Sequence, residues 1–563
     1  MNFMKIIADL QIHSRFARAT SQKINVPYIY SYALQKGINL VATGDWTHPL
    51  WLRELKANLE EDGSGFLKFK KSDENSSEPF SNKESSETKI SSLVNSSFHS
   101  SDKHSVRILS PSDSKEDFRG VSLDPHFLLA TEISSIYSQG GKLRRIHNLV
   151  WAPDFATVEK INSALIKRGC NLGSDGRPIV GLTSQEIVEI VLSINDRCLI
   201  IPAHIWTPWF SLYGSKSGFD SVEECFGDFA KYIYGIETGL SSDPVMNWRI
   251  KNLDHRAILS FSDAHSGQKL GREATVFDLE EPSYDVLRKA IMNDSGDSGS
   301  SSEPFSSGRR VNSYTNSFGD TKKISSGRLE TSEMSTIRKG SFGASSVNPS
   351  EKDPHGVLAD NSRGVSFKNK ISGTIEFYPE EGKYHYTGHR LCSVKHTPQE
   401  TKKMGTICHV CGKPLTVGVM HRVEELSGRD VVPVEKNIGG IRWLYHPENK
   451  KPPFVNLVPL MEIIAEVENV SAASVKVTEK YDEITKSLGP EFEILLKTPL
   501  SEIGKLGGGK MEDAIKRVRL GSIYIDPGYD GVFGVVKIWG KETEKSGKST
   551  GSDESKKEQM SFF

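Results

Sequence analysis

Short apolar runs alternate with helical patterns between residues 1 and 292 of the chain. The runs typical of strands are 4–8, 38–43, 128–132, 145–150, 199–203 and 258–262. Between them, apolar residues recur with a helical period at 27–36, 48–60, 155–168 and 184–194. Strands that alternate with helices predict parallel βαβ units, in an open sheet or in a barrel. In both architectures the chemistry lies at the carboxyl ends of the strands.

Two long stretches and the C-terminal tail interrupt this pattern. Residues 70–117, 293–370 and 541–563 consist mainly of small polar and charged residues. Such segments bury too little apolar area to offset the entropy of ordering the backbone. They explain why only 36% of the chain is hydrophobic, below the roughly 45–50% of an average globular domain. We therefore expect two disordered Ser-rich insertions and a disordered tail.

The composition also narrows the class of protein. The chain has no run of about 18 apolar residues, so we expect no membrane span and no membrane partner. Its six cysteines are unevenly spaced, which favours metal binding or redox chemistry over a disulfide framework. The formal net charge is −1, so any affinity for nucleic acid must come from local basic patches. We expect a cytoplasmic protein.

Metal-ligating residue types follow one predicted strand after another. A single histidine of this kind is more often a hydrogen-bonded structural residue than a ligand. Six consecutive segments that each bring imidazole or carboxylate groups to one end of an α/β unit instead predict a site for several divalent ions. Closely spaced ions of this kind activate water and stabilise the oxygens of a phosphate ester. The candidate catalytic and metal-binding residues are Gln11, His13, Asp45, His48, Glu132, His147, His204, Asp263 and His265.

This series resembles the polymerase and histidinol phosphatase (PHP) superfamily of metal-dependent phosphoesterases, which fold as a distorted β/α barrel. Residues 8–21, 43–52, 132–137, 373–386 and 528–534 are more narrowly similar to endonuclease Q. The resemblance implies a metal-dependent DNA repair endonuclease that incises on the 5′ side of deaminated bases (hypoxanthine, uracil, xanthine) and of abasic sites. It also implies damaged DNA as the partner, an association with the nucleoid, and Zn, Mg or Mn as the active-site metal.

One residue departs from the family pattern. The family opens with His-x-His, and here Gln11 stands in the first position. A glutamine oxygen coordinates a hard cation such as Mg²⁺ or Mn²⁺ but is a poorer ligand for zinc than imidazole. Two alternatives therefore stay open: a PHP-type small-molecule phosphatase, and a non-catalytic DNA-binding protein of the same fold.

A second cluster of metal-ligating residues lies beyond the barrel region, in residues 371–450. Cys408 and Cys411 form a Cys-x-x-Cys turn with a glycine directly after it, and Cys392 supplies a third sulfur. His389 completes a four-ligand structural zinc site, with His385 and His421 as less favoured ligands. A redox-active Cys-x-x-Cys is the competing interpretation, but no thioredoxin-like βαβ pattern surrounds it. We expect a small zinc-ribbon domain.

Residues 451–540 are predicted to form a C-terminal helical domain. Two helical stretches meet at a glycine-rich turn and resemble a helix-hairpin-helix, which holds a DNA phosphate without reading sequence. An ordinary helical hairpin with a solvated basic face is the alternative. The candidate DNA-binding residues are Lys505, Gly507, Lys510, Lys516, Arg517 and Arg519.

Several aromatic residues complete the set of candidates. Phe562 and Phe563 end a polar tail and resemble a degenerate sliding-clamp-binding peptide. Aromatic side chains near the expected metal site could stack on displaced bases or belong to the core. These are Trp46, Trp51, Trp206, Trp209 and Phe210, and Tyr384 is a further candidate with its neighbour His385.

Overall fold

The computed structural model describes residues 3–70, 124–294 and 369–540. The two expected insertions, at 70–117 and 293–370, fall almost wholly outside these ranges. The tail 541–563, with the clamp-peptide candidates Phe562 and Phe563, lies outside them entirely. The described residues belong to one compact unit with one large hydrophobic core cluster. None of their helices is both long enough and apolar enough to cross a lipid bilayer.

Three parallel strands form the centre of the main sheet. They are β1 (Met4–Asp9), β2 (Leu40–Ala42) and β5 (His126–Gln139), in that order. Helices α1 (Val26–Lys36) and α2 (Pro49–Asn58) follow the first two strands, as the sequence pattern predicts. Asn25 caps α1 by accepting from the backbone of Tyr28, and Gly37 ends it with a φ of 79°. The short strands β3 (Leu59–Glu61) and β4 (Leu67–Phe69) extend the sheet beyond β5.

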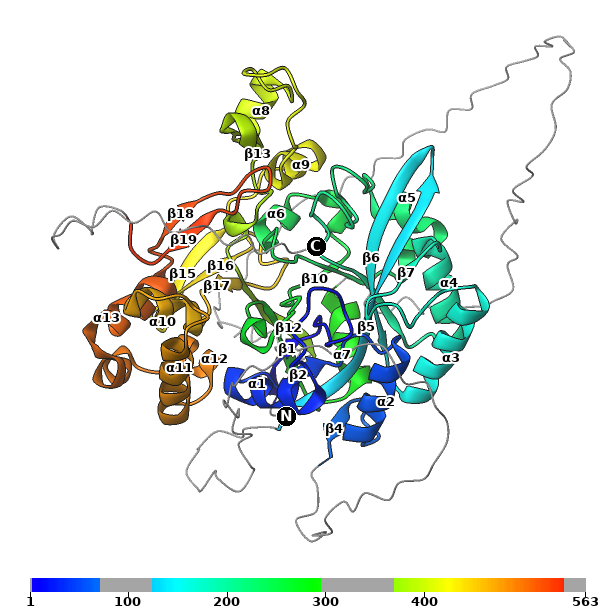
Figure 1. The fold of residues 1–563 in the computed structure, drawn as a ribbon, viewed down its shortest axis with the longest axis horizontal. Coiled ribbons are helices and arrows are strands. Elements are labelled where there is room, and N and C mark those ends of the chain that lie inside the picture. The colour runs from blue at the N-terminus through cyan, green and yellow to red at the C-terminus, as the bar shows by residue number, and fades with distance from the viewer. Residues whose placement is uncertain (1–2, 71–123, 295–368, 541–563) are drawn as a thin grey trace, which may run out of the picture. The chain divides into compact units, whose positions relative to one another are not determined.

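The next connection differs from the predicted parallel arrangement. Strand β6 (Lys142–Ala152) pairs antiparallel with β5, so the two form a long hairpin, drawn in cyan in Figure 1. Gly140 and Gly141 make its turn with φ values of 61° and 72°, which suits a tight hairpin turn that only glycine adopts easily. Strand β8 (Leu199–Pro202) pairs antiparallel with β6, and β7 (Ile179–Val180) pairs with β5.

Two helices cover this part of the sheet. Helix α3 (Phe155–Lys167) begins at Asp154, whose carboxylate accepts from the backbone of Thr157. Helix α4 (Ser184–Ile194) begins with a capping box between Thr183 and Glu186. Further short elements follow β8: α5 (Val222–Phe226), α6 (Pro244–Trp248) and, after β11, α7 (Tyr284–Asp294).

The strands expected for a barrel are all present, but the backbone hydrogen bonds between neighbouring strands are interrupted at two places. Strands β9 (Gly235–Glu237) and β10 (Ala257–Leu259) pair only with each other, while β11 (Ala274–Leu279) returns antiparallel to β1. In residues 124–294 no ladder joins β8 to β9 or β10 to β11. A side-chain contact bridges each gap instead: Glu237 Oε2 accepts from the backbone N–H of His204 at 2.7 Å, and Thr275 Oγ1 accepts from that of Ser260 at 2.9 Å.

The segment expected to be a separate zinc domain contributes three strands to the same sheet (β12, β15 and β16), and the segment expected to be purely helical contributes a fourth (β17). β12 pairs with β11, β17 pairs with β12, and β16 and β15 continue to the edge. The bounds are β12 (Lys370–Glu376), β15 (Val434–Ile438), β16 (Ile441–Tyr445) and β17 (Phe454–Asn456). Only the part between β12 and β15 leaves the sheet. It holds β13 (Thr387–His389), β14 (Val394–His396), α8 (Pro398–Met404) and α9 (Val419–Leu426).

The C-terminal region is helical, as expected, and is drawn in orange in Figure 1. A buried ion pair joins it to the first helix of the chain, because Lys36 Nζ lies 2.6 Å from Glu491 Oε2. Glu491 also accepts from Tyr481 Oη and from the backbone of Leu460, both at 2.9 Å, so both oxygens of this buried carboxylate have partners. The elements are α10 (Leu460–Glu468), α11 (Val475–Leu488), α12 (Glu491–Leu496), α13 (Leu500–Leu520), β18 (Tyr524–Asp526) and β19 (Val535–Lys537).

Candidate metal centre

Glu132 lies at the centre of the predicted site and contacts histidines on both sides. Its Oε1 lies 2.6 Å from His147 Nδ1 and 3.2 Å from His204 Nε2. Its Oε2 lies 3.0 Å from His13 Nε2. His147 and Glu132 come from the paired strands β6 and β5, while His204 follows β8. One carboxylate therefore links two groups of imidazoles.

Two sets of three ligand atoms converge at this position. Glu132, His147 and His204 form one set, and His13, Asp263 and His265 form the other, with the ligand atoms of each set within 4.8 Å of one another. A backbone bridge between Ile12 and Ala264 brings the second set together, and the N–H of His13 donates to Ala264 O at 3.0 Å. Six of the nine predicted ligands therefore meet in one place.

Two buried atoms of the second set make no hydrogen bond of good geometry. They are His13 Nε2 and Asp263 Oδ1, although Nε2 lies 3.2 Å from Asp263 Oδ1 and 3.0 Å from Glu132 Oε2. Buried polar atoms without a partner are costly. An imidazole nitrogen facing a carboxylate oxygen is a donor set that suits a divalent cation. The residues present therefore fit the metal that the strand-end pattern predicts.

Neighbouring side chains orient these ligands. Asp45 Oδ1 lies 2.9 Å from His13 Nδ1, which leaves Nε2 of that ring facing Glu132. The backbone N–H of Ser14 donates to the other oxygen of Asp45 at 2.6 Å. Ser211 Oγ lies 3.2 Å from Nδ1 of His204, so that ring also turns Nε2 toward Glu132. Such outer contacts fix the tautomer and the direction of a ligating histidine.

Three residues of the site have unusual backbone conformations. Asp45, His204 and Asp263 have φ values of 45°, 29° and 47°, in the left-handed region that side chains other than glycine rarely adopt. Strain of this kind is retained where the surrounding structure imposes it, often at functional sites. Each of the three residues lies just after the end of a strand, where the chain turns its side chain toward the site.

The electrostatics of the site keep the His147 ring neutral and the Glu132 carboxylate ionised. Burial lowers the pKa of His147 to about 4, which leaves its ring neutral at pH 7. Burial alone would raise the pKa of Glu132, but His147 and Arg177 outweigh it and hold that pKa well below its usual value. Neutral imidazole and ionised carboxylate are the forms that bind metal.

Arg177 and Glu237 belong to the site but were not predicted from the sequence. Arg177 NH1 lies 3.3 Å from Glu132 Oε2. Burial works against its charge, but Glu132 and Asp263 outweigh that effect and raise its pKa. Glu237 is fully buried at the end of β9; burial, together with the nearby acidic side chains, raises its pKa well above the usual value.

Gln11 faces Glu237. With its amide group turned to match its surroundings, the Gln11 nitrogen donates to the Glu237 carboxylate, at 2.6 Å from Oε2. The residue in the first position of the family's His-x-His pair is therefore hydrogen-bonded to a carboxyl group in this structure. Gln11 does not belong to either set of converging ligand atoms.

His48 and Asp45 also lie outside those two sets. The ring of His48 stacks on Phe16, with 4.4 Å between the ring centroids, and burial lowers its pKa. Asp45 touches the site only through His13. That His48 and Asp45 ligate a metal directly remains a prediction.

The structure sorts the candidate aromatic residues by burial. Trp46, Trp51 and Trp206 are at most 1% exposed and belong to the core. Trp209, Phe210 and Tyr384 are partly exposed. His385 is buried, and burial lowers its pKa to about 4.

The cysteine cluster assembles as expected. His389, Cys392, Cys408 and Cys411 bring four ligand atoms within 4.8 Å of one another, and His385 and His421 are not among them. Burial would raise the pKa of the Cys408 thiol, but the backbone N–H groups of Cys411 and Val410 outweigh it and lower that pKa to about 6. A Cys₃His set with an activated thiol suits tetrahedral zinc.

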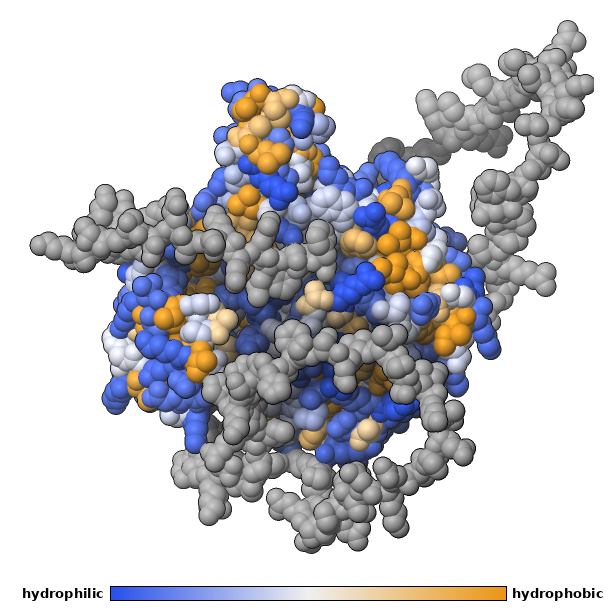
Figure 2. All heavy atoms as spheres, viewed as in Figure 1, coloured by the Kyte–Doolittle hydropathy of each residue, from blue (hydrophilic) through white to orange (hydrophobic). Residues whose placement is uncertain are grey.

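The segment around this cluster has a very small core of its own. Only Val394, Cys408 and Leu415 form its buried apolar cluster, so bound metal would supply much of its stability. Its outer surface is apolar in part, as Figure 2 shows, because Leu391, Met404, Ile407 and Val410 are 50–80% exposed. Residues 383–418 carry six Lys or Arg residues and one Glu, so the segment is strongly basic.

The glycine-rich turn of the C-terminal region is a sharp break inside α13. Gly508 has φ 80° and ψ 167°, which separates two helical halves. Lys505 and Lys516 are exposed on either side of the break. Lys510 Nζ donates to Val467 O at 2.6 Å, and Arg517 pairs with Asp513 at 2.7 Å.

Arg519 has a structural role and is not a surface cation. It is 5% exposed, and its guanidinium donates to the backbone oxygens of Ile494, Leu495 and Thr498 at 2.6–2.9 Å. These are free carbonyls at and just beyond the end of α12. The basic pattern along α13 predicted a phosphate contact for Arg519, but its position on the buried face of the helix prevents one.

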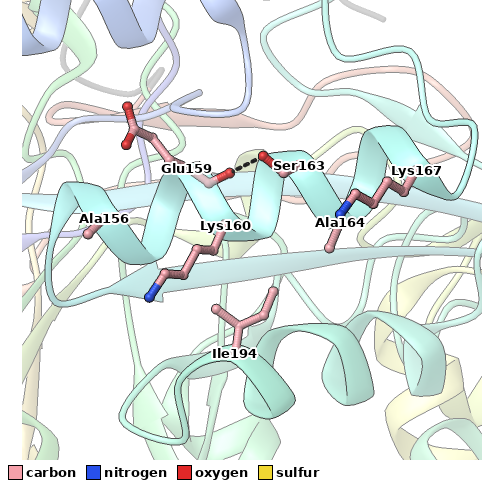
Figure 3. Close-up of a pocket in the computed structure, with 7 residues that line it drawn as sticks. All are labelled: Ala156, Glu159, Lys160, Ser163, Ala164, Lys167 and Ile194. Atoms are coloured by element: carbon pink, nitrogen blue, oxygen red, sulfur yellow. Dashed lines mark hydrogen bonds between the residues drawn. The ribbon is translucent and has the colours of Figure 1, made fainter.

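A shallow depression of about 510 Å³ lies on the outer side of α3. Figure 3 shows its lining by side chains of α3 and by Ile194 at the end of α4. None of the predicted site residues lines it, so it is separate from the metal centre.

Sequence comparison matches parts of the chain to one family and to two curated proteins. Residues 459–522 match the family described as the MJ0043 C-terminal domain. The chain is 25% identical over 346 residues to the uncharacterized protein MJ0043 of Methanocaldococcus jannaschii. It is 37% identical over 133 residues to the uncharacterized protein YqxK of Bacillus subtilis. These matches cover 60% and 23% of this chain, but only 32% of each relative, so the chain corresponds to about a third of either protein.

Solved structures match nearly the whole chain. The lesion-specific endonuclease PfuEndoQ from Pyrococcus furiosus aligns over 97% of this chain and 100% of its own, with a TM-score of 0.63 and 24% identity. The chain has the endonuclease Q fold. A structure of endonuclease Q in complex with a 27-mer duplex substrate, with an abasic lesion at the active site, aligns over 96% of this chain and 98% of its own, also with a TM-score of 0.63 and 24% identity.

The extent of the endonuclease Q match accounts for the arrangement described above. Since it covers 97% of this chain, the similarity in fold includes the segment with the cysteine cluster and the C-terminal helices along with the central sheet.

Proposed function

We propose that this protein is a metal-dependent endonuclease that hydrolyses a phosphodiester bond in damaged DNA, on the 5′ side of a deaminated base or an abasic site. The observation that carries the proposal is the position of Glu132. Its two oxygens contact histidines of two ligand sets, at 2.6 Å on the His147 side and 3.0 Å on the His13 side. A carboxylate shared in this way is suited to hold two cations close together.

The residues of this chain have separate parts in the reaction. His13, Asp263 and His265 would hold one ion, and His147 and His204 another, with Glu132 common to both. Bound divalent ions supply Lewis acidity that activates water and stabilises the oxygens of a phosphate ester. Asp45 and Ser211 keep two of the ligating rings in position. Arg177 places a buried positive charge beside Glu132, where it can offset negative charge on a bound phosphate.

Three features favour DNA over a small phosphate ester. The endonuclease Q fold covers nearly the whole chain, and one structure of that fold holds an abasic duplex. The segment 383–418 is basic, with six Lys or Arg residues and one Glu, although the whole chain has a net charge of −1. Lys505 and Lys516 flank the break at Gly508. Cations placed in this way contact phosphates without reading sequence.

An incision assay tests the proposal. End-labelled duplexes that contain uracil, hypoxanthine, xanthine or an abasic site are compared with an undamaged duplex, with Mg²⁺, Mn²⁺ or Zn²⁺ added in turn. We expect a metal-dependent cut 5′ of the lesion in at least one damaged duplex and none in the undamaged control. Hydrolysis of a generic phosphomonoester without DNA incision would instead indicate a small-molecule phosphatase.

The variant Gln11→His, compared with wild type in the same assay, tests whether the first position of the His-x-His pair is required. If the wild-type protein incises nothing and Gln11→His incises damaged DNA, this chain is a non-catalytic relative in which the pairing of Gln11 with Glu237 has replaced a ligand. If both proteins incise, the first position of the pair is not required, and the proposal stands. If neither protein incises any duplex, the endonuclease proposal is wrong.

A further inference from the structure

A row of aromatic rings leads from the metal centre to the C-terminal part of the chain. It begins at Phe210, whose ring centroid lies 4.8 Å from that of His147. Trp209 follows in the sequence, and its ring meets that of Tyr384 edge-on at 5.5 Å. Phe533 is the last member, joined to Tyr384 through Lys383, which lies 5.7 Å from each of the two rings. Three segments that are distant in the sequence therefore contribute to one row.

The rings of this row are partly or largely open to solvent. Phe533 is 56% exposed, and Trp209, Phe210 and Tyr384 have intermediate exposure. This distinguishes them from Trp46, Trp51 and Trp206, which are at most 1% exposed and lie in the core. Single exposed aromatic side chains are common, but several partly exposed rings close together offer faces on which another molecule can stack.

The row is held rigidly. The loop that carries Phe533 is fastened to residues 380–386 by four backbone hydrogen bonds of 2.8–3.0 Å: Gly528 N–H to Glu380 O, Gly531 N–H to Lys383 O, Gly534 N–H to Glu381 O and Tyr386 N–H to Gly528 O. Phe210 has a φ of 62°, a strained value for phenylalanine. Its carbonyl oxygen accepts from the backbone of His147 at 3.2 Å. Rings fixed before binding lose little conformational entropy when a ligand stacks on them.

Two cations accompany the rings. Arg145 Cζ lies 5.4 Å from the centroid of Phe210, at the end of the row nearest the metal centre. Lys383 lies between Tyr384 and Phe533 at the other end. Aromatic rings with a positive charge near each end match the two parts of an unpaired DNA strand, because the bases stack on rings while the phosphates contact cations.

We infer that this row, formed by Trp209, Phe210, Tyr384 and Phe533, binds an unpaired stretch of DNA strand next to the cleaved phosphate. The inference rests on the proposed function, and it adds a surface that receives nucleotides unstacked from the duplex. A nucleotide cannot leave a base stack without loss of its neighbours' stacking. The rings replace part of that stacking outside the duplex and favour the open form of the DNA.

Binding of single-stranded DNA by the full-length protein tests the inference separately from cleavage. The probe is a fluorescent oligothymidylate of about 12 nucleotides, which lacks any lesion. Stacking of one base on an aromatic ring is worth roughly 1–3 kcal/mol, so we expect Phe533→Ala to weaken binding by about fivefold or more. Phe533→Trp keeps a stacking face and should bind within about twofold of wild type. Ile166→Ala, at a residue on the outer side of α3 that is 60% exposed, is the matched control and should bind as wild type does.

Tyr384→Phe and Lys383→Gln separate stacking from charge. Tyr384→Phe keeps the ring and should bind normally, while Lys383→Gln should reduce the dependence of binding on salt. Unchanged binding by Phe533→Ala, with circular dichroism equal to that of wild type, would overturn the inference. A loss in Lys383→Gln without any loss in Phe533→Ala would overturn it as well, because charge alone would then explain binding.

The incision assay distinguishes this inference from the proposed function. If wild type cuts damaged duplex and Phe533→Ala binds the oligonucleotide equally well, the function stands and the inference fails. If wild type cuts nothing while Phe533→Ala loses binding, the surface is real and the hydrolytic function fails.

Discussion

Oε2 of Glu132 lies 3.0 Å from Nε2 of His13. Glu132 belongs to β5 and His13 follows β1, and β2 lies between these two strands in the sheet. Each is less than 3% exposed. The contact places a carboxylate of β5 between the ligand set that follows β1 and the set that includes β6 and β8.

Replacing Glu132 by Gln should remove activity while the fold is retained. The amide keeps the size of the side chain but loses the charge that two cations share. We expect a loss of at least about 100-fold in incision rate, with a lower content of bound metal in the purified protein. Glu159→Gln, on the outer side of α3, is the control and should keep both. A variant with full metal content and full activity would show that Glu132 has no part in the site.

Asp45→Asn tests the orientation of His13. Asp45 uses one oxygen for the Ser14 N–H and the other for His13 Nδ1. Asparagine keeps only one acceptor oxygen, so it can no longer accept from both groups and holds the His13 ring less firmly. We expect metal affinity to fall by about 10–100-fold, measured by competition with a chromogenic chelator. Asp278→Asn, in a surface ion pair with Lys5, should leave the affinity unchanged. Equal affinities in the two variants would argue that Asp45 does not position a ligand.

Removing one cysteine ligand should unfold the zinc-binding segment alone. Cys392→Ser takes one of four ligands from a segment whose own core is very small. We expect the protein to lose one zinc ion per chain and residues 383–418 to become sensitive to protease, while the central sheet stays folded. Cys170→Ser is the control, because Cys170 does not belong to the cysteine cluster. Retention of the zinc ion by Cys392→Ser would contradict the assignment.

Glu376 should make the protein less stable as the pH rises. Burial raises its pKa to about 8, against 4.5 for the free side chain, although Ser260 and Thr374 hydrogen-bond to it. Between these pH values the folded state keeps a proton that the unfolded state releases, so the free energy of unfolding falls as pH increases. The slope from this group is at most about 1.4 kcal/mol per pH unit.

Glu376→Gln removes that titration. Urea unfolding at pH 5.5 and 7.5 should show a smaller pH dependence in the variant than in wild type. Glu435→Gln, at an exposed residue on β15, should behave as wild type does. Identical slopes for Glu376→Gln and wild type would mean that Glu376 is already ionised in the folded protein.

Residue types at strand ends were sufficient to predict most of the residues that converge at the candidate metal centre. His13, His204 and Asp263 each follow a strand whose apolar run is plain in the sequence, and the fold brings them together. Glu132 and His147 lie inside the β5–β6 hairpin. That hairpin was not predicted because the pair Gly140–Gly141, a strong turn signal, falls beyond the short apolar runs that were taken as separate strands.

The residues that sequence reasoning missed depend on tertiary contacts. Arg177 lies in an irregular segment, and only the folded chain places it 3.3 Å from Glu132. Glu237 ends a three-residue strand that has too few residues for a clear pattern. Arg519 was wrongly placed on a DNA-binding face because charge along a helix does not by itself show which side is buried.

Anomalous diffraction from crystals grown with Zn²⁺ or Mn²⁺ would show whether cations bind beside Glu132. We expect one peak among His13, Asp263 and His265 and another among His147 and His204, with Glu132 between them. A third peak at the cysteine cluster, in crystals with Zn²⁺, would show that the data detect bound metal. A peak at the cysteines with none beside Glu132 would mean that the residues around Glu132 do not form a metal site.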